Sequence, residues 1–590
     1  MLRKKVPVRL FKTILLIILT TALAVVLEAV TISSIEKLNN INNKFQKATA
    51  NHKNYNKSVT FSQIIYDEKS VKELMRLIIT NESKTFQHIK HKAFIQDVYQ
   101  RKAYRPIWFT YKGLQKEALY DLFNTIEGDD TLEEFGAIKK EYHSLKERIF
   151  KTKTRTLNHE LMFDLELTSL YYSYLKHHLY GSINWSNFQR KLYSLRRRHV
   201  AANWVTHTPK YDIADILLKH RLSYIVSLTT PSSFNYNRLR DELSRLRAVQ
   251  RRGGWKKIPN SSQLRYGKSG KVVKQLTLRL QSEGDYTCGH NSSKYSYDTC
   301  LKRAVKRFQK RHGLAQTGTI NSATRKKLNL SVNWKINKIL LNLDRIKRLP
   351  DQPEDRYIMV NIPEFRLFYR ENGHNKLTMR VVVGDKTHHT PIFSNKISYI
   401  VLNPYWLIPN SIVKKEIIPK MLKNPNYLEQ RGYEVRKNYN FKRPPIDTSK
   451  IDWARVLRTG QLKKYKFMQP PGQKNALGKI KFKFPNQFAV YIHDTPAKKY
   501  FKKSFRAFSH GCIRIAQPKA LLATFAKYER SVNYNRAKRI LQGKVKTQLN
   551  LSHHVPIHIV YLTARIKSDG LLHYLPDVYG YDAKQKRNID

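Results

Sequence analysis

The sequence predicts an α+β protein of several domains, with a helical amino-terminal half, a compact three-helix unit and a mainly β carboxy-terminal domain. Three observations lead to this prediction. The chain has 590 residues, and at about 150 residues per domain that length predicts three or four domains. Apolar residues recur at helical spacing up to about residue 330, whereas short β-rich runs begin at about residue 355. A composition of 41% hydrophobic residues is compatible with several packed cores and argues against general disorder.

The amino terminus has the pattern of an export signal. Basic residues from Arg3 to Lys12 precede an uncharged apolar run over 13–27, and only Glu28 interrupts the stretch that continues to Ile35. We expect an uncleaved anchor over 1–35, with the basic end in the cytoplasm. Cleavage near Ala24, as in a signal peptide, is the alternative. Either arrangement places the remaining chain in an extracytoplasmic, disulfide-permissive space.

The charge balance is strongly basic. Lys and Arg number 110 against 44 Asp and Glu, a formal net charge of +66. Such a charge favours polyanionic partners: nucleic acid, anionic lipid headgroups or a carboxylate-rich polymer. The export signal argues against nucleic acid, and no recognition motif for it accompanies the charge.

The next segments are a linker and a helical domain. Residues 36–89 are rich in Asn, Lys and Ser and are expected to be a linker. From 90 to 265 the pattern is helical: Leu119, Leu122, Phe123 and Ile126 fall at i, i+3, i+4 and i+7. We interpret 90–265 as a helical scaffold domain.

Residues 266–332 form a compact unit. Its notable stretches are 276–284, Tyr297-Asp298, Ala304-Val305, Phe308-Gln309, Gly313-Leu314, Thr317-Gly318 and Leu328-Asn329. On these residues the unit resembles the three-helix peptidoglycan-binding domain. Apolar stripes define two of its helices, and an ordinary helical bundle is the alternative interpretation. Thr317 stands where family members usually have Asp, which questions a polar role there. Cys288 and Cys300 lie twelve residues apart in this unit and form either a disulfide or two buried thiols.

The pattern over 355–585 predicts a carboxy-terminal domain made of a series of strands. An insertion at about 407–474 breaks this series, with a helix expected over 411–422, and an insertion of that length is most often a lid. The expected strands are 357–362, 366–369, 379–383, 399–402, 480–484, 489–492, 556–562 and 571–574.

The candidate catalytic residues lie in one stretch of this domain. His493 ends an expected strand, and fifteen residues separate it from Ser509-His510-Gly511-Cys512. A neighbouring imidazolium would stabilise a thiolate and lower the cysteine pKa. Gly511 permits a tight turn that could aim the Gly511 and Cys512 amides at an oxyanion. A zinc site is the weaker alternative because no further ligand cluster accompanies the stretch; a buried, inert thiol is another.

This pattern is similar to the signature of the L,D-transpeptidase catalytic domain, or YkuD domain, and the surroundings resemble its YcbB-like branch. The order of anchor, scaffold, peptidoglycan-binding unit and capped catalytic domain also agrees. Arg514 stands where many members have Asn, and His510 stands where some have Ser. The quoted matches are 403–406, which ends in Trp406, then 469–472, 475–478 and 493–496.

The resemblance implies roles for individual residues. Cys512 would be the nucleophile and His493 the general base, with His510 the weaker candidate. The Gly511 and Cys512 amides would form the oxyanion hole with the Tyr491 hydroxyl. Support of the loop or contact with substrate is expected of Ser509, His510, Arg514 and Trp406, where Arg514 would meet a carboxylate. No metal and no cofactor are expected.

The implied reaction forms peptidoglycan cross-links between the third residues of two stem peptides, through a Cys512 thioester with release of D-Ala. The partners are stem peptides in the periplasm, with no nucleic acid; partner proteins are not predicted. Three alternatives stay open. The first is an L,D-carboxypeptidase or wall-protein amidase that uses the same nucleophile. The others are a non-catalytic wall-binding protein and a binder of anionic lipid.

Overall fold

The computed structural model describes residues 68–80, 84–110, 113–152, 156–288, 295–350, 355–441, 443–585 and 587. All of them belong to one compact unit, Ile64–Asp590. The predicted anchor, 1–35, and most of the predicted linker lie outside these residues. Within the described part of the chain, every helix is too short or too polar to cross a bilayer.

The first described helices form a core of their own, in which the predicted stripe of α5 is confirmed: Leu119, Leu122, Phe123 and Ile126 are all buried. The 24-residue helix α7 lies among the others and buries residues on every side. The elements are α2 (Glu68–Thr80), α3 (Lys84–Gln87), α4 (Lys92–Arg101), β1 (Phe109–Thr110), β2 (Gly113–Leu114), α5 (Lys116–Glu127), α6 (Ala137–Lys151), α7 (Leu157–Tyr180), α8 (Trp185–Arg197), α9 (Ile213–Lys219) and α10 (Leu222–Thr229).

The predicted linker of 36–89 is too long. Helix α2 begins at Glu68 and buries Met75 and Ile79 in the same core as α5 and α7. Val71, Met75 and Ile79 recur every four residues, a spacing that builds one apolar helix face. The helical domain therefore begins about 20 residues earlier than the composition of the segment suggests.

The three-helix unit contains α12 (Lys271–Gln281), α13 (Thr299–Arg311) and α14 (Ser322–Leu328) around a core that includes the predicted stripes. Gln309 is fully buried, and its side chain accepts from the Gly318 amide at 2.9 Å and donates to Thr317 Oγ1 at 3.2 Å. Thr317 thus supplies the polar contact that its departure from the family pattern had placed in question. Cys288 and Cys300 are joined as a disulfide.

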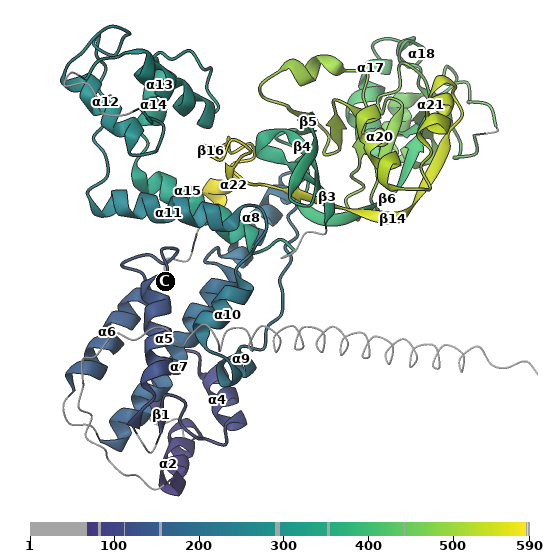
Figure 1. Ribbon diagram of the computed structural model, residues 1–590. Coiled ribbons are helices and arrows are strands. Elements are labelled where there is room, and N and C mark those ends of the chain that lie inside the picture. The colour runs from purple at the N-terminus through teal and green to yellow at the C-terminus, as the bar shows by residue number, and fades with distance from the viewer. Residues whose placement is uncertain are drawn as a thin grey trace, which may run out of the picture. The chain divides into compact units, whose positions relative to one another are not determined.

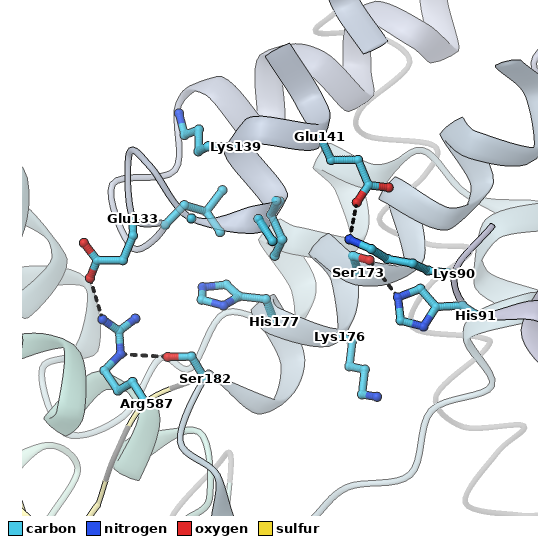
Figure 2. A pocket seen from close by; sticks show the side chains of 15 residues that line it. Lys90, His91, Glu133, Lys139, Glu141, Ser173, Lys176, His177, Ser182 and Arg587 are labelled. Atoms are coloured by element: carbon cyan, nitrogen blue, oxygen red, sulfur yellow. Dashed lines mark hydrogen bonds and ion pairs between the residues drawn. The ribbon is translucent and has the colours of Figure 1, made fainter. Parts of the chain in front are cut away.

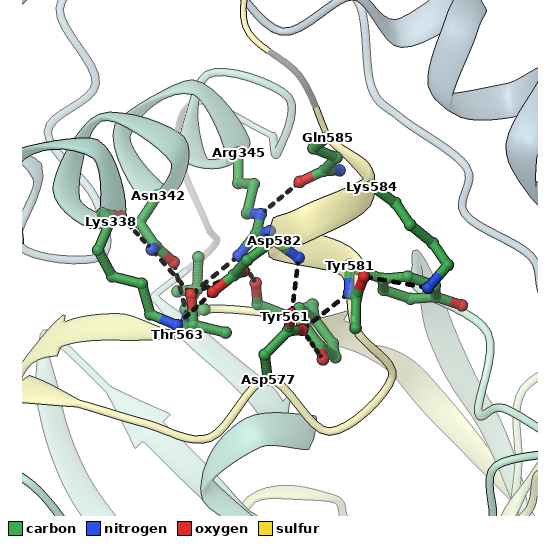
Figure 3. A network of polar contacts seen from close by, with 12 residues as sticks. Lys338, Asn342, Arg345, Tyr561, Thr563, Asp577, Tyr581, Asp582, Lys584 and Gln585 are labelled. Carbon is green, nitrogen blue, oxygen red and sulfur yellow. Dashed lines mark hydrogen bonds and ion pairs between the residues drawn. The ribbon is translucent and has the colours of Figure 1, made fainter. Parts of the chain in front are cut away.

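Helices α11 (Tyr236–Arg251) and α15 (Val332–Ile346) pack together and share a core with the edge of the carboxy-terminal domain (Figure 1). Lys338 and Arg345 of α15 both bind Asp582 in α22 (Tyr581–Lys584), and the Arg345 contact is 2.7 Å (Figure 3). Asn342 donates to Thr563 Oγ1 at 3.1 Å in the same network. These contacts anchor the end of the chain on α15.

The carboxy-terminal domain contains a nine-stranded mixed sheet in the order β12-β5-β13-β11-β10-β6-β14-β3-β4, and β4 also pairs with β5, which closes the sheet on itself. Its helices include α20 (Pro518–Tyr528) and α21 (Tyr534–Gln542), with apolar faces in the core. The strands are β3 (Arg356–Asn361), β4 (Arg366–Glu371), β5 (His374–Gly384), β6 (Phe393–Leu402), β10 (Ile480–Lys483), β11 (Ile492–His493), β12 (Ala507–Ser509), β13 (Ile513–Ile515) and β14 (Thr547–Val560); β15 (Ala564–Ile566) and β16 (Leu572–Tyr574) form a separate pair.

The strand predictions hold for most segments, but 489–492 is wrong. Strand β11 begins only at Ile492, because Ala489 has a left-handed backbone (φ 54°) and the Asn486 side chain bonds the backbone at Phe484 and Val490. A residue in that conformation cannot continue a strand.

The insertion folds as a small cap with its own apolar core. The helix expected over 411–422 is present as α16 (Asn410–Ile412), η3 (Val413–Ile417) and α17 (Ile418–Met421). The cap also holds a three-stranded sheet, β7-β9-β8, which the sequence pattern did not predict. The remaining cap elements are β7 (Trp406–Leu407), α18 (Tyr427–Arg431), β8 (Glu434–Arg436), α19 (Trp453–Arg458), η4 (Gln461–Lys464) and β9 (Lys466–Gln469).

Candidate active site

His493 lies at the end of β11, between β10 and β13 in the sheet. Its register partners are Lys481 on β10 and Arg514 on β13. The ring is buried, and Nδ1 lies 2.5 Å from the carbonyl oxygen of Asp494. Because a carbonyl oxygen only accepts, Nδ1 must carry the proton, and in the neutral ring Nε2 is then the basic nitrogen. The fold thus selects the tautomer that a general base needs.

The position of Asp494 is set by its own side chain. The Asp494 carboxylate accepts from the backbone amides of Lys479 at 3.0 Å and Thr495 at 2.7 Å, and from Lys498 Nζ at 2.5 Å. Gly478 packs directly on this carboxylate: a Cβ built there would lie 2.3 Å from Oδ2, and its φ of 60° also favours glycine. Asp494 therefore positions the histidine through its backbone carbonyl.

Cys512 stands immediately before β13, at the end of a tight turn. Gly511 has a φ of 103°, which side chains other than hydrogen rarely tolerate. Ser509 Oγ donates to the Cys512 carbonyl at 2.5 Å and accepts from the Gly511 amide at 3.3 Å, while Thr390 Oγ1 donates to the Gly511 carbonyl at 2.8 Å. Through these contacts Ser509 holds the backbone of the turn, as a supporting role would require.

Tyr491 contacts the thiol. The Tyr491 hydroxyl and the Cys512 side chain share a hydrogen bond, and burial raises the pKa of Tyr491 well above its usual value. The phenol is therefore a proton donor at neutral pH, as the predicted oxyanion role requires. The Ile513 amide donates to the Tyr491 carbonyl at 3.0 Å, which holds the two segments together.

The protonation of the pair differs from the sequence expectation. Burial lowers the pKa of His493 to about 3, with Arg514 the next cause. Burial also raises the pKa of Cys512 above its ordinary value of 9.0, although the Tyr491 hydrogen bonds and Lys481 oppose the shift. These shifts oppose the expected thiolate stabilised by an imidazolium, because desolvation disfavours both charged forms. At rest these shifts favour a neutral thiol and a neutral imidazole, which line the same cavity.

The other predicted residues divide into two groups. His510 points to the cap, where its Nε2 lies 2.6 Å from Glu416 Oε1 and its ring packs on His388. Trp406 and Arg514 line the same cavity as Cys512. Arg514 Nε is buried and has no hydrogen-bond partner among the described residues, so it is available to a ligand.

A cavity of about 680 Å³ opens over Cys512 between the sheet and the cap. Its wall includes three lysines that the sequence reasoning missed, Lys481, Lys483 and Lys546. The alternation of Lys481 and Lys483 with buried Ile480 and Phe482 was visible as a strand with a polar face, but nothing in the sequence indicated that this face meets the cysteine.

A second cavity, of about 500 Å³, lies among the scaffold helices (Figure 2). Its charges are largely compensated within the wall: Lys90 pairs with Glu141 at 3.1 Å and Arg587 with Glu133 at 2.7 Å. His91 Nε2 bonds Ser173 at 2.8 Å. No cysteine is among the described residues that line this cavity. Over the whole described part of the chain, no three His, Cys, Asp or Glu side chains gather as a metal site would require.

Comparison with known families agrees with this site. Residues 355–532 match the model of the L,D-transpeptidase catalytic domain, called YkuD. The carboxy-terminal domain belongs to this family. Residues 93–243 match a family described as "Scaffold domain", and residues 269–328 match one described as "Putative peptidoglycan binding domain". The chain thus contains a region that matches the YkuD catalytic domain, together with regions that match a scaffold domain and a peptidoglycan-binding domain.

Individual relatives match only part of this chain. A Haemophilus influenzae protein named "Putative L,D-transpeptidase" is 33% identical over 245 residues, 42% of this chain and 48% of that protein, so the match spans about half of the relative. Solved L,D-transpeptidases from Mycobacterium smegmatis and Xylanimonas cellulosilytica are 11% and 13% identical; they cover 35% and 51% of this chain and 58% and 100% of their own. Both have TM-scores of 0.17, which is too low to carry an argument.

Proposed function

We propose that this protein is a peptidoglycan L,D-transpeptidase that joins the third residues of two stem peptides through a Cys512 thioester. The observation that carries the proposal is the fixed tautomer of His493 in the same cationic cavity as the half-buried thiol of Cys512. A general base whose proton-accepting nitrogen is preset is a requirement of acyl transfer by cysteine.

The first half of the reaction acylates the cysteine. His493 Nε2 takes the thiol proton as Sγ attacks the carbonyl carbon between the third residue and D-Ala, so the neutral pair ionises only as the new bond forms. The Cys512 amide and the Tyr491 hydroxyl stabilise the oxyanion. The Gly511 amide contributes less, because it already donates to Ser509. The carbon–nitrogen bond then breaks, the histidine proton passes to the amine, and D-Ala leaves.

The second half transfers the acyl group. The side-chain amine of an acceptor's third residue attacks the thioester carbon, its proton passes to His493 Nε2, and the thiol of Cys512 is restored with one new amide bond. Water in place of the amine would give an L,D-carboxypeptidase. The contact of the cap with the catalytic loop, through Glu416 and His510, favours transfer, since a closed cavity excludes water from the thioester.

The proposed setting is the periplasm, with residues 1–35 as an inner-membrane anchor. The peptidoglycan-binding domain would hold the enzyme on its polymeric substrate. That domain contacts the catalytic domain directly: Arg311 Nε donates to the Leu572 carbonyl at 2.8 Å. Binding and catalysis would then act on neighbouring parts of one polymer.

The test is intact-mass spectrometry of the full-length protein with a disaccharide-tetrapeptide, beside a Cys512→Ala variant. The proposal expects an adduct of the stem minus D-Ala on the parent alone, followed by dimeric muropeptide. Release of D-Ala without dimer would support the hydrolase instead. No adduct and no release from folded protein would leave a wall-binding role.

A further inference from the structure

Three lysines on the wall of the cavity have no part in the mechanism above. Lys481 and Lys483 project from the same face of β10, two residues apart. Lys546 immediately precedes β14. The first residue of β14 and the first residue of β10 both pair with Leu402 of β6. All three line the cavity that holds Cys512.

These lysines have no anionic partner. In the described part of the chain none of the three makes an ion pair or a hydrogen bond. Lys481 Nζ lies 3.9 Å from the centre of the Tyr491 ring and Lys483 Nζ lies 5.3 Å from it. Among the described residues that line the cavity, Glu416 is the single acidic side chain, and it is engaged by His510.

Clustered like charges on a partly buried wall are unfavourable without a counter-ion. Burial and then the neighbouring Lys483 lower the pKa of Lys481 to about 8. The scaffold cavity differs, because its Lys90 and Arg587 are paired with glutamates of the same wall. The wall at Cys512 is therefore arranged for an anion that comes from outside the chain.

The position of the cluster identifies which anion. Lys481 is the register partner of His493 and lies on the ring of Tyr491, whose hydroxyl bonds the thiol. In a peptide that is cut one residue before its end, the terminal carboxylate is three covalent bonds from the scissile carbonyl carbon. When that carbon is at Sγ, the carboxylate must lie in the immediate surroundings of Cys512.

We propose that Lys481, Lys483 and Lys546 form a carboxylate subsite that binds the free carboxyl end of the leaving amino acid. This inference rests on the proposed function. The subsite would select donors by length, since a donor peptide with one more residue would place its terminal carboxylate beyond the lysines. It also predicts discrimination against a donor whose end is a neutral amide.

The first experiment compares two donors on the full-length protein: the disaccharide-tetrapeptide and the same compound with a carboxamide end. Acylation is followed by intact mass. The parent should prefer the acid by roughly 10- to 100-fold, the range for hydrogen bonds to a charged group. Lys481→Gln, and the double variant Lys483→Gln with Lys546→Gln, should lose most of that preference.

The matched control is Lys519→Gln, an exposed lysine on α20 outside the cavity, which should keep the parental preference. Circular dichroism checks the fold of each variant. The double variant changes side chains that are not deeply buried, so the test does not depend on the tolerance of Lys481. Equal use of acid and amide by the parent would overturn the proposal, and so would an equal loss for both donors in the variants.

A second experiment separates this inference from the proposed function. Iodoacetate and iodoacetamide alkylate the same thiolate, but only iodoacetate carries a carboxylate. The ratio of their rates at Cys512 should fall roughly tenfold in the double variant and stay unchanged in Lys519→Gln. A fall without acylation by any donor would keep the anion subsite and reject the transpeptidase. An unchanged ratio beside normal acylation would reject the subsite alone.

Discussion

Alkylation of Cys512 by iodoacetamide should be slow at neutral pH and should accelerate up to and beyond pH 9. Burial raises the thiol pKa above 9.0 and holds the His493 pKa near 3, so no imidazolium is available to stabilise a thiolate between these values. Since each pH unit below the pKa removes a factor of ten, less than about 0.1% of the thiol is ionised at pH 6. A thiolate–imidazolium pair would be almost fully ionised there, so the two descriptions differ by roughly a thousandfold in reactive thiol.

The assay measures the alkylation rate from pH 5 to 10 by intact mass. Cys512→Ala is the control for site selectivity, because Cys288 and Cys300 are joined as a disulfide. Lys481→Gln should slow alkylation below pH 8, since the charged lysine favours the thiolate, and its effect should shrink above pH 8, where Lys481 itself loses its charge. A plateau of rapid alkylation between pH 5 and 7 would refute the reasoning.

Three further outcomes are expected. Gly478→Ala should lower the melting temperature by several degrees and slow D-Ala release, because its Cβ displaces the Asp494 carboxylate; Gly472→Ala, whose Cβ meets no atom within 4 Å, should be close to neutral, and equal effects would contradict this account. Glu416→Gln should change stability by less than about 1 kcal/mol but raise the ratio of free D-Ala to dimeric muropeptide, measured by chromatography; a constant ratio would exclude a role of this contact in closing the cap. Lys335→Met should cost about 3 kcal/mol in urea unfolding, since it leaves a buried glutamate short of a cation, and a cost below about 1 kcal/mol would argue against that ion pair.

The chemistry of the site was predictable because it is local. Only fifteen residues separate His493 from the Ser509–Cys512 segment, and the types and order of these residues already implied a nucleophile, a base and a tight turn. The structure adds the hydrogen bond that selects the tautomer, which depends on backbone direction after β11. It also favours a neutral thiol and a neutral imidazole in place of the expected ion pair. That difference arises from desolvation, which depends on burial, and a sequence motif does not show burial.

The features that sequence reasoning missed are non-local. The lysines of the cavity reach Cys512 only through the register between β10 and β11, and a shift by one residue would turn Lys481 to the opposite face. The sheet of the cap likewise pairs Trp406 with Gln469, more than sixty positions apart in the chain. The early start of α2 is different: its stripe, with Met75 and Ile79, was present, but the surrounding Asn, Lys and Ser residues outweighed it in the composition.

The lysines that would hold the leaving carboxylate also bear on the second half of the reaction. After the amino acid leaves, they are again without a counter-ion, now beside an acylated Cys512. A positive field lowers the pKa of a nearby ammonium group and so favours the uncharged amine that attacks the thioester. The double variant Lys483→Gln with Lys546→Gln should therefore require a higher pH for half-maximal aminolysis of its preformed acyl-enzyme, measured by rapid mixing with an acceptor stem. Hydrolysis of the same acyl-enzyme is the internal control, since water carries no charge. An aminolysis profile that does not move would restrict the lysines to donor binding.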